Sequence, residues 1–203
     1  MTIYLVRHGK DDPTLRGGWS QAGLTAEGHQ QAETLADYAR ANQHQLQIRR
    51  VFASDLPRAT ETAMPLAAAL GLVVEQMPQF REANNGALAG MPNEIASERY
   101  PGLYWNVLDW DERYPGSGES PRMCYERIKD AWATFSEEAT KAGENVCLVT
   151  HGGVINIIYT LVRGTSFSNK TPSEAVPHAK LIAFELRGSA WKEKTLLRGN
   201  AVL

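Results

Sequence analysis

Two short segments of this chain carry residue types that together can bind and attack a phosphate ester. Arg7 and His8 follow the apolar run 2–6, and His151 follows the apolar run 145–149. A guanidinium donates two parallel hydrogen bonds to phosphate oxygens. An imidazole can act as a nucleophile or carry a proton near neutral pH. The same combination at the end of two apolar runs indicates one shared anion site.

A second arginine and one acidic residue extend this chemistry. Arg58 falls in the first turn of a helix expected to begin at Pro57, where free backbone N–H groups and the helix dipole favour a bound anion. Glu82 lies in a loop rich in glycine and asparagine. Its carboxyl group is the acid available to protonate a departing alkoxide.

The two histidines can meet only if the strands before them lie side by side. Periodicity and turn residues predict strands at 2–6, 50–53, 72–75, 145–149, 179–186 and 191–197, and helices at 25–41, 57–70, 120–142 and 154–161. Strands that alternate with helices favour a three-layer α/β fold, an αβα sandwich with a largely parallel central sheet. In such sheets ligands bind at the carboxyl ends of the strands.

Four segments, in this order, resemble the histidine phosphatase superfamily, also called phosphoglycerate mutase-like. They are LVRHG at 5–9, SDLPRATETA at 54–63, the loop 82–90 and VTHGGVI at 149–155. The segments are spread over most of the chain, so we expect one histidine phosphatase domain over residues 1–203. The resemblance implies a three-layer αβα fold and a covalent phosphohistidine intermediate.

The resemblance also implies a role for each site residue. His8 would be the nucleophile, which we expect at the surface edge of the sheet. The phosphate pocket would consist of Arg7, Arg58 and His151, with Gly152 beside them. Glu82 would protonate the leaving group and then activate water. No metal and no other cofactor is implied, and the sequence has no His-Glu-x-x-His motif.

The residues after Glu82 favour hydrolysis over transfer. Mutases of this superfamily carry an arginine directly after the acid, whereas Ala83, Asn84 and Asn85 follow here. The expected function is a histidine acid-base phosphatase, a phosphomonoesterase that acts on a small phosphorylated metabolite. Two alternatives stay open: a phosphoglycerate mutase-type phosphotransferase, and a non-catalytic phosphate-binding or scaffold protein.

Some residues near the predicted site depart from the family pattern. Lys10 and Asp11 stand where many relatives carry Glu or Gln and then Thr. Asp11 and Asp12 would repel a phosphate, so we expect them to point away from it or to contact a cationic part of the substrate. The run 118–120, Gly-Glu-Ser, matches a segment near the lid of relatives. It would form the pocket rim, or cap the following helix.

A lid-like insertion is expected at about 83–118. From Pro92 onward it is predicted to be irregular, and it is rich in aromatic residues: Tyr100, Tyr104, Trp105, Trp110 and Tyr114. Such a stretch suits a lid or pocket wall, a dimer surface or a small separate core. His178 precedes the strand predicted at 179–186 and is assigned no role.

Composition excludes several classes of partner. The net charge of −2 and the scattered basic residues argue against binding to nucleic acid or to an anionic membrane. The longest apolar stretch, 154–162, is too short to span a bilayer. Without a recognisable signal peptide, and with Cys124 and Cys147 predicted as buried free thiols, a cytoplasmic location is expected. A homodimer stays open, since dimers are common among relatives.

Overall fold

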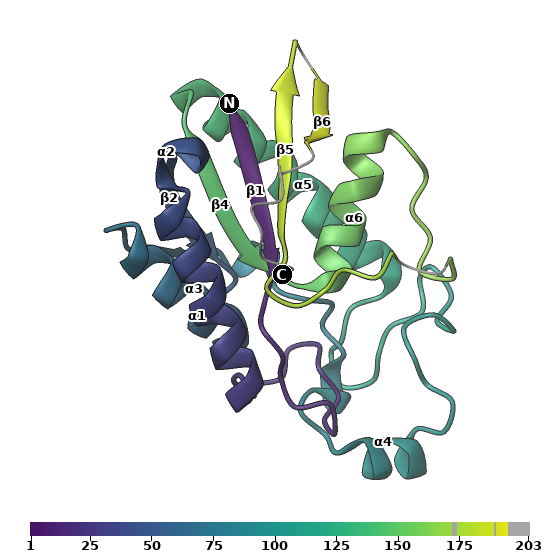
Figure 1. The fold of residues 1–203 in the computed structure, drawn as a ribbon. Coiled ribbons are helices and arrows are strands. Elements are labelled where there is room, and N and C mark those ends of the chain that lie inside the picture. Colours follow the sequence, from purple (N-terminus) through teal and green to yellow (C-terminus); the bar gives the residue numbers. More distant parts are fainter. Residues whose placement is uncertain (172–173, 189, 195–203) are drawn as a thin grey trace.

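The computed structural model describes residues 1–171, 174–188 and 190–194, arranged as shown in Figure 1. Its elements are, in chain order, β1 (Thr2–Arg7), α1 (Ala26–Ala41), α2 (Gln43–Leu46), β2 (Ile48–Ala53), α3 (Pro57–Ala69), β3 (Val74–Gln76), the 3-10 turns η1 (Pro78–Phe80) and η2 (Gly86–Leu88), α4 (Asn93–Arg99), α5 (Pro121–Ala142), β4 (Asn145–Thr150), α6 (Gly152–Arg163), β5 (Leu181–Arg187) and β6 (Ala190–Lys194). The predicted alternation of strands and helices is confirmed. Residues 195–197 of the last predicted strand lie outside the described residues.

The strands form one sheet in the order β3-β2-β4-β1-β5-β6. β1 pairs in parallel with β4, and β2 pairs in parallel with β4 and β3. β5 and β6 are antiparallel to their neighbours and complete one edge. The predicted largely parallel sheet is confirmed for four strands, and the strands that precede the two histidines are direct neighbours.

Side chains of the central strands alternate between two cores, one on each face of the sheet. Ile3 and Leu5 of β1 pack in the core with side chains of α5 and α6, whereas Tyr4 and Val6 pack in the core with α1 and α3. β4 alternates in the same way. Figure 1 shows the two helix pairs on opposite sides of the sheet, so the three-layer prediction is confirmed.

Two helices begin where the sequence places a capping side chain. The Thr25 hydroxyl accepts a hydrogen bond from the Gly28 N–H of α1 at 3.1 Å, and the Ser120 hydroxyl accepts one from the Met123 N–H of α5 at 3.2 Å. α3 has no such cap, because the polar residues before it make other contacts. Ser54 and Asp55 instead bond to His151 and Arg81.

The segment predicted as an insertion, about 83–118, contains more order than its sequence indicates. Residues 93–99 form α4, so the prediction of an irregular stretch is wrong there. A helix of 7 residues that buries only Ala96 leaves no periodic apolar pattern to detect. Leu88, Leu108 and Tyr114 form a small separate core within the insertion. In Figure 1 this part of the chain lies beyond the carboxyl ends of β1 and β4, where it can form one wall of a site.

Both cysteines are buried and free, as predicted. Cys147 lies in β4, and Cys124 lies on the buried face of α5. No helix of the described residues has the length and apolar character needed to cross a bilayer.

The central strands should dominate the stability of the fold. Leu148 is fully buried in β4, and truncating such a side chain leaves a cavity. Leu148→Ala should therefore lower the free energy of unfolding by about 3 kcal/mol. The matched control is Val73→Ala: Val73 is 79% exposed, and this truncation should cost less than about 0.5 kcal/mol. Urea denaturation measures both, and equal losses would contradict this account of the core.

Candidate active site

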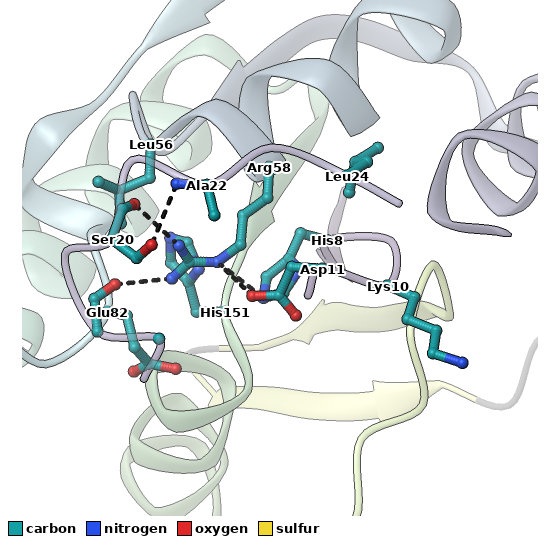
Figure 2. A network of polar contacts seen from close by, with 12 residues as sticks. His8, Lys10, Asp11, Ser20, Ala22, Leu24, Leu56, Arg58, Glu82 and His151 are labelled. Atoms are coloured by element: carbon teal, nitrogen blue, oxygen red, sulfur yellow. Dashed lines mark hydrogen bonds and ion pairs between the residues drawn. The ribbon is translucent and has the colours of Figure 1, made fainter. Parts of the chain in front are cut away.

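The pairing of β1 with β4 brings the two predicted histidines together. Arg7 lies opposite Thr150 in the register, and the His8 N–H donates to the Thr150 carbonyl at 2.9 Å. The imidazole rings of His8 and His151 then lie 5.1 Å apart, centroid to centroid. Figure 2 shows them side by side at the end of the sheet, as the sequence predicted.

His8 is more deeply buried than expected. Only 4% of it is exposed and His151 is fully buried, so the expected position of His8 at the surface edge is wrong. The loop after β1 causes this burial, because it folds back over the end of the strand. Within that loop the Gly9 N–H donates to the hydroxyl of Thr62 on α3 at 2.9 Å.

Arg58 is the cation at the centre of this cluster. Its side chain is 2% exposed, and its guanidinium donates to the carbonyls of Gly18 at 2.7 Å and Ser20 at 3.2 Å. Its Nε–H donates to Nε2 of His8 at 3.2 Å (Figure 2). The loop thus supplies carbonyl oxygens to a desolvated cation, which is the compensation that buried charge requires.

The ring of His8 has a fixed orientation and charge state. Nδ1 lies 2.7 Å from the Gly9 carbonyl, which can only accept, so Nδ1 carries the proton and Nε2 carries the lone pair. Burial, and then the neighbouring Arg58 cation, hold the pKa of His8 well below its ordinary value. At neutral pH His8 therefore presents an unprotonated Nε2 toward Arg58.

Two polar atoms in this cluster lack a protein partner. Nε2 of His151 contacts the Ser54 hydroxyl at 2.9 Å, but its Nδ1 is buried without a hydrogen bond. Arg7 donates from Nη1 to the Val176 carbonyl at 2.7 Å, whereas its Nε is also buried without a partner. Buried polar atoms are rarely left unpaired. Both atoms are thus available to a ligand.

Asp11 does not point away from the cluster as predicted. Its Oδ2 lies 3.4 Å from Nε of Arg58, so the first of the two alternatives, that Asp11 points away, is wrong. The attraction of a buried guanidinium for an anion explains the contact. Asp12 does turn outward and caps the loop by accepting from the Thr14 N–H at 2.9 Å. Lys10 pairs with Glu27 at 2.5 Å on the exposed side (Figure 2 shows Lys10 directed away).

Glu82 lies in the loop after η1, and its side chain reaches across the cluster to the first turn of α6. Its carboxylate accepts from the N–H groups of Gly153 and Ala83, each at 3.1 Å. Its backbone carbonyl accepts from the Trp19 indole at 2.7 Å and from Arg127 at 3.1 Å. Gly152, the remaining predicted site residue, lies beside Arg7: a Cβ at this position would be 3.5 Å from Nε of Arg7. The predicted site residues are therefore gathered in one place.

Sequence reasoning missed Arg127, which fixes the loop that carries Glu82. From α5 it donates to the carbonyls of Gln79, Arg81 and Glu82, and it forms an ion pair with Glu119 at 2.7 Å. Glu119 is therefore a structural residue and does not line the pocket rim. Arg127 falls outside the apolar stripe of the helix predicted at 120–142, so the sequence gave no sign that it makes these contacts.

His178 is the second residue that sequence reasoning missed. Its Nδ1 donates to the His8 carbonyl at 3.0 Å, and its ring lies 5.4 Å from the ring of His8. Because β5 runs antiparallel to β1, the residues just before β5 lie at the carboxyl end of β1. Only the strand direction, which the sequence did not specify, would have placed His178 there.

A cavity of about 330 Å³ opens beside Glu82. The insertion supplies much of its wall, including Tyr104, Trp105 and Tyr114. Trp110 instead packs against Tyr125 and Phe167. In the described residues, no group of three or more His, Cys, Asp or Glu side chains could hold a metal ion.

This fold, with its cluster at the carboxyl ends of adjacent parallel strands, defines a protein of the phosphoglycerate mutase-like α/β class. The family model of the histidine phosphatase superfamily (branch 1) matches residues 3–197. The chain belongs to this superfamily, whose members are phosphatases or mutases.

Curated relatives agree with this assignment, and solved structures share the fold. The chain is 34% identical over 167 residues to phosphoglycerate mutase-like protein 4 of Arabidopsis thaliana, covering 79% of this chain and 70% of that protein. It is 30% identical over 195 residues to metal-independent phosphoserine phosphatase of the same plant, covering 93% and 78%. Mycobacterial glucosyl-3-phosphoglycerate phosphatase superposes with a TM-score of 0.75 at 24% identity over 95% of this chain and 96% of that one. YhfR of Bacillus stearothermophilus does so with a TM-score of 0.80 at 22% identity, over 95% and 94%.

The charge state of the site can be measured by NMR. The pKa values of His8 and His151 are both lowered well below the ordinary value, mainly by burial, so both rings should stay neutral from pH 8 to about pH 6. The imidazole NMR signals of the two rings, assigned by their loss in His8→Gln and His151→Gln, should not shift between pH 8 and about pH 6. In the unfolded chain these rings take up protons below about pH 6.5, so the free energy of unfolding should decrease as the pH falls below that value. A midpoint near pH 6.5 for either folded ring would contradict this.

Proposed function

We propose that the protein is a metal-independent phosphomonoesterase that hydrolyses a small phosphorylated metabolite through a phosphohistidine intermediate. The observation that carries this proposal is the lone pair on Nε2 of His8, which is held beside Arg58 within the cluster. An unprotonated imidazole is a competent nucleophile toward phosphorus. When a phosphate binds, the hydrogen bond from Arg58 would pass from Nε2 to a phosphate oxygen.

Three groups would hold the phosphate during this attack. The guanidiniums of Arg7 and Arg58 supply positive charge and directed donors. His151 would donate from its unpartnered Nδ1, with the Ser54 hydroxyl proton directed to Nε2. Such donors stabilise the charge that develops on the equatorial oxygens in the transition state. Asp11 would have to give up its contact with Arg58 as the phosphate enters.

Glu82 would complete the reaction as acid and then as base. Nε2 of His8 attacks phosphorus, the ester P–O bond breaks, and the leaving oxygen takes the proton of the Glu82 carboxyl group. Water then attacks the phosphohistidine and gives its proton to the Glu82 carboxylate, and the P–N bond breaks to release phosphate. Glu82 lines the cavity and lies across the Arg58 guanidinium from His8 in Figure 2, and this position supports the role.

Hydrolysis is favoured over transfer by the residues next to Glu82. The amide oxygens of Asn84 and Asn85 accept from the backbone of Gly86 and Trp19, so these side chains serve the loop itself. The likeness to metal-independent phosphoserine phosphatase also supports hydrolysis. A phosphoglycerate mutase-type phosphotransferase would differ by requiring a bisphosphorylated primer. A non-catalytic phosphate-binding or scaffold protein would bind phosphate without covalent labelling.

Replacement of the nucleophile is the first test. His8→Ala and His8→Gln should each lower turnover of 4-nitrophenyl phosphate at least about a thousandfold, because the proposed covalent intermediate forms on Nε2 of His8. The exposed His44→Ala is the matched control and should retain full activity. Quenching in base, which preserves the P–N bond, should capture label on wild type and on His44→Ala, and none on the His8 variants. Wild-type turnover should also survive a chelator. A folded His8→Ala variant with full activity would refute the mechanism.

The acid role of Glu82 predicts a dependence on the leaving group. Glu82→Gln should slow hydrolysis of an alkyl phosphate by about a hundredfold or more, since an alkoxide needs protonation. The loss for 4-nitrophenyl phosphate should be at least about tenfold smaller, because nitrophenolate leaves without a proton. Glu98→Gln, on the exposed side of α4, is the control. Equal losses for both substrates would exclude the acid role.

A further inference from the structure

The cavity beside Glu82 is lined largely by rings and aliphatic side chains. Tyr114, Leu88 and Ile157 are among its buried walls, and Trp105 and Phe167 also line it. Burial raises the pKa of Tyr114 to about 12, as expected for a phenol shielded from water. Because Glu82 lies on the same cavity, the alcohol portion of a phosphate ester would occupy this space.

Arg16 is the cation of this cavity wall. Its backbone is fixed at both ends: its N–H donates to the Met91 carbonyl, and its carbonyl accepts from the Gly90 N–H, each at 2.8 Å. Its guanidinium lies over the ring of Tyr104, with Cζ 4.3 Å from the ring centroid. Tyr104 is 46% exposed, so the pair stands at the open side of the cavity.

The charge of Arg16 is not neutralised within the described part of the chain. No carboxylate there lies within 4.0 Å of its guanidinium nitrogens, in contrast to Arg81 and Arg127, which both form ion pairs. The Nε–H of Arg16 is buried and has no acceptor. A buried N–H without a partner costs stability. An anionic acceptor on a bound molecule would remove that cost and would pair with the charge of the guanidinium.

From these contacts we propose that the cavity selects phosphate esters whose alcohol portion is a flat ring bearing a second anionic group, which Arg16 binds. The proposal rests on the phosphatase function above and specifies its substrate class. The ring would pack against Trp105 and Tyr114, and the anion would accept from the guanidinium of Arg16. A carboxylate and a second phosphate share this chemistry, since both accept two parallel hydrogen bonds from arginine.

Three alkyl phosphates separate the effect of the ring from that of the anion. Ethyl, benzyl and 4-carboxybenzyl phosphate all release a primary alkoxide, so differences in kcat/KM report mainly on the alcohol site. Benzyl phosphate should exceed ethyl phosphate by about tenfold, as burial of a ring predicts. 4-Carboxybenzyl phosphate should exceed benzyl phosphate by a further factor of about ten, which is typical of one charge-assisted hydrogen bond. A 4-phosphonobenzyl analogue would compare the two kinds of anion.

Variants of Arg16 test the assignment directly. Arg16→Gln should reduce the preference for the carboxylated ester over benzyl phosphate to about one. Arg16→Lys keeps the positive charge but cannot donate two parallel hydrogen bonds, so it should keep part of this preference. The control Arg49→Gln removes an exposed arginine of β2 and should keep the full preference. If Arg16→Gln does not fold, the comparison of Arg16→Lys with wild type decides.

The possible outcomes are distinct. Equal losses for both esters in Arg16→Gln would mean that Arg16 is structural, and the proposal would be wrong. Turnover of 4-nitrophenyl phosphate with no preference for rings would also overturn the proposal, while leaving the phosphatase function intact. If no ester is hydrolysed and His8 is never labelled, the proposed function fails, and the substrate class fails with it.

Discussion

The site depends on the parallel pairing of β1 with β4. This pairing sets Arg7 opposite Thr150, the last residues of the two strands, and a histidine directly follows each of them. A shift of one residue in the register would turn the apolar side chains of β1 toward the wrong core and would separate the two rings. Ile3, Tyr4, Leu5 and Val6 are all buried, on alternate faces of the sheet, so a shift would require both cores to repack at once. The core that stabilises the fold is therefore also what aligns the site.

Burial of charge is the second constraint. The guanidinium of Arg58 lies away from water, and burial lowers its pKa. The desolvation of Arg58 is compensated by the loop after β1, which supplies the carbonyls of Gly18 and Ser20 and the carboxylate of Asp11. The same loop covers His8 and keeps it unprotonated. One desolvated cation thus holds the loop after β1, the ring of His8 and the carboxylate of Asp11 together.

The sequence predicted the regular parts of this structure well, because their signals are local. Apolar runs located β1 and β4, and Thr25, Ser120 and Gly143 marked helix ends through capping and turn chemistry. The family motifs identified the residues that the structure gathers into the cluster. The sequence did not predict that Asp11 contacts Arg58, that Arg127 binds the loop carrying Glu82, or that His178 lies beside His8. Each of these depends on which distant segment comes close in space, and no local pattern records that.

The two thiols of the chain have a consequence for its behaviour under oxidation. A cysteine reacts with peroxide or alkylating reagents as the thiolate. Burial raises the pKa of Cys147 to about 12, and it also raises the pKa of Cys124. Both sulfur atoms therefore stay protonated and inert near neutral pH. With imidazole instead of sulfur as the nucleophile, the proposed reaction would be insensitive to the redox state of its surroundings.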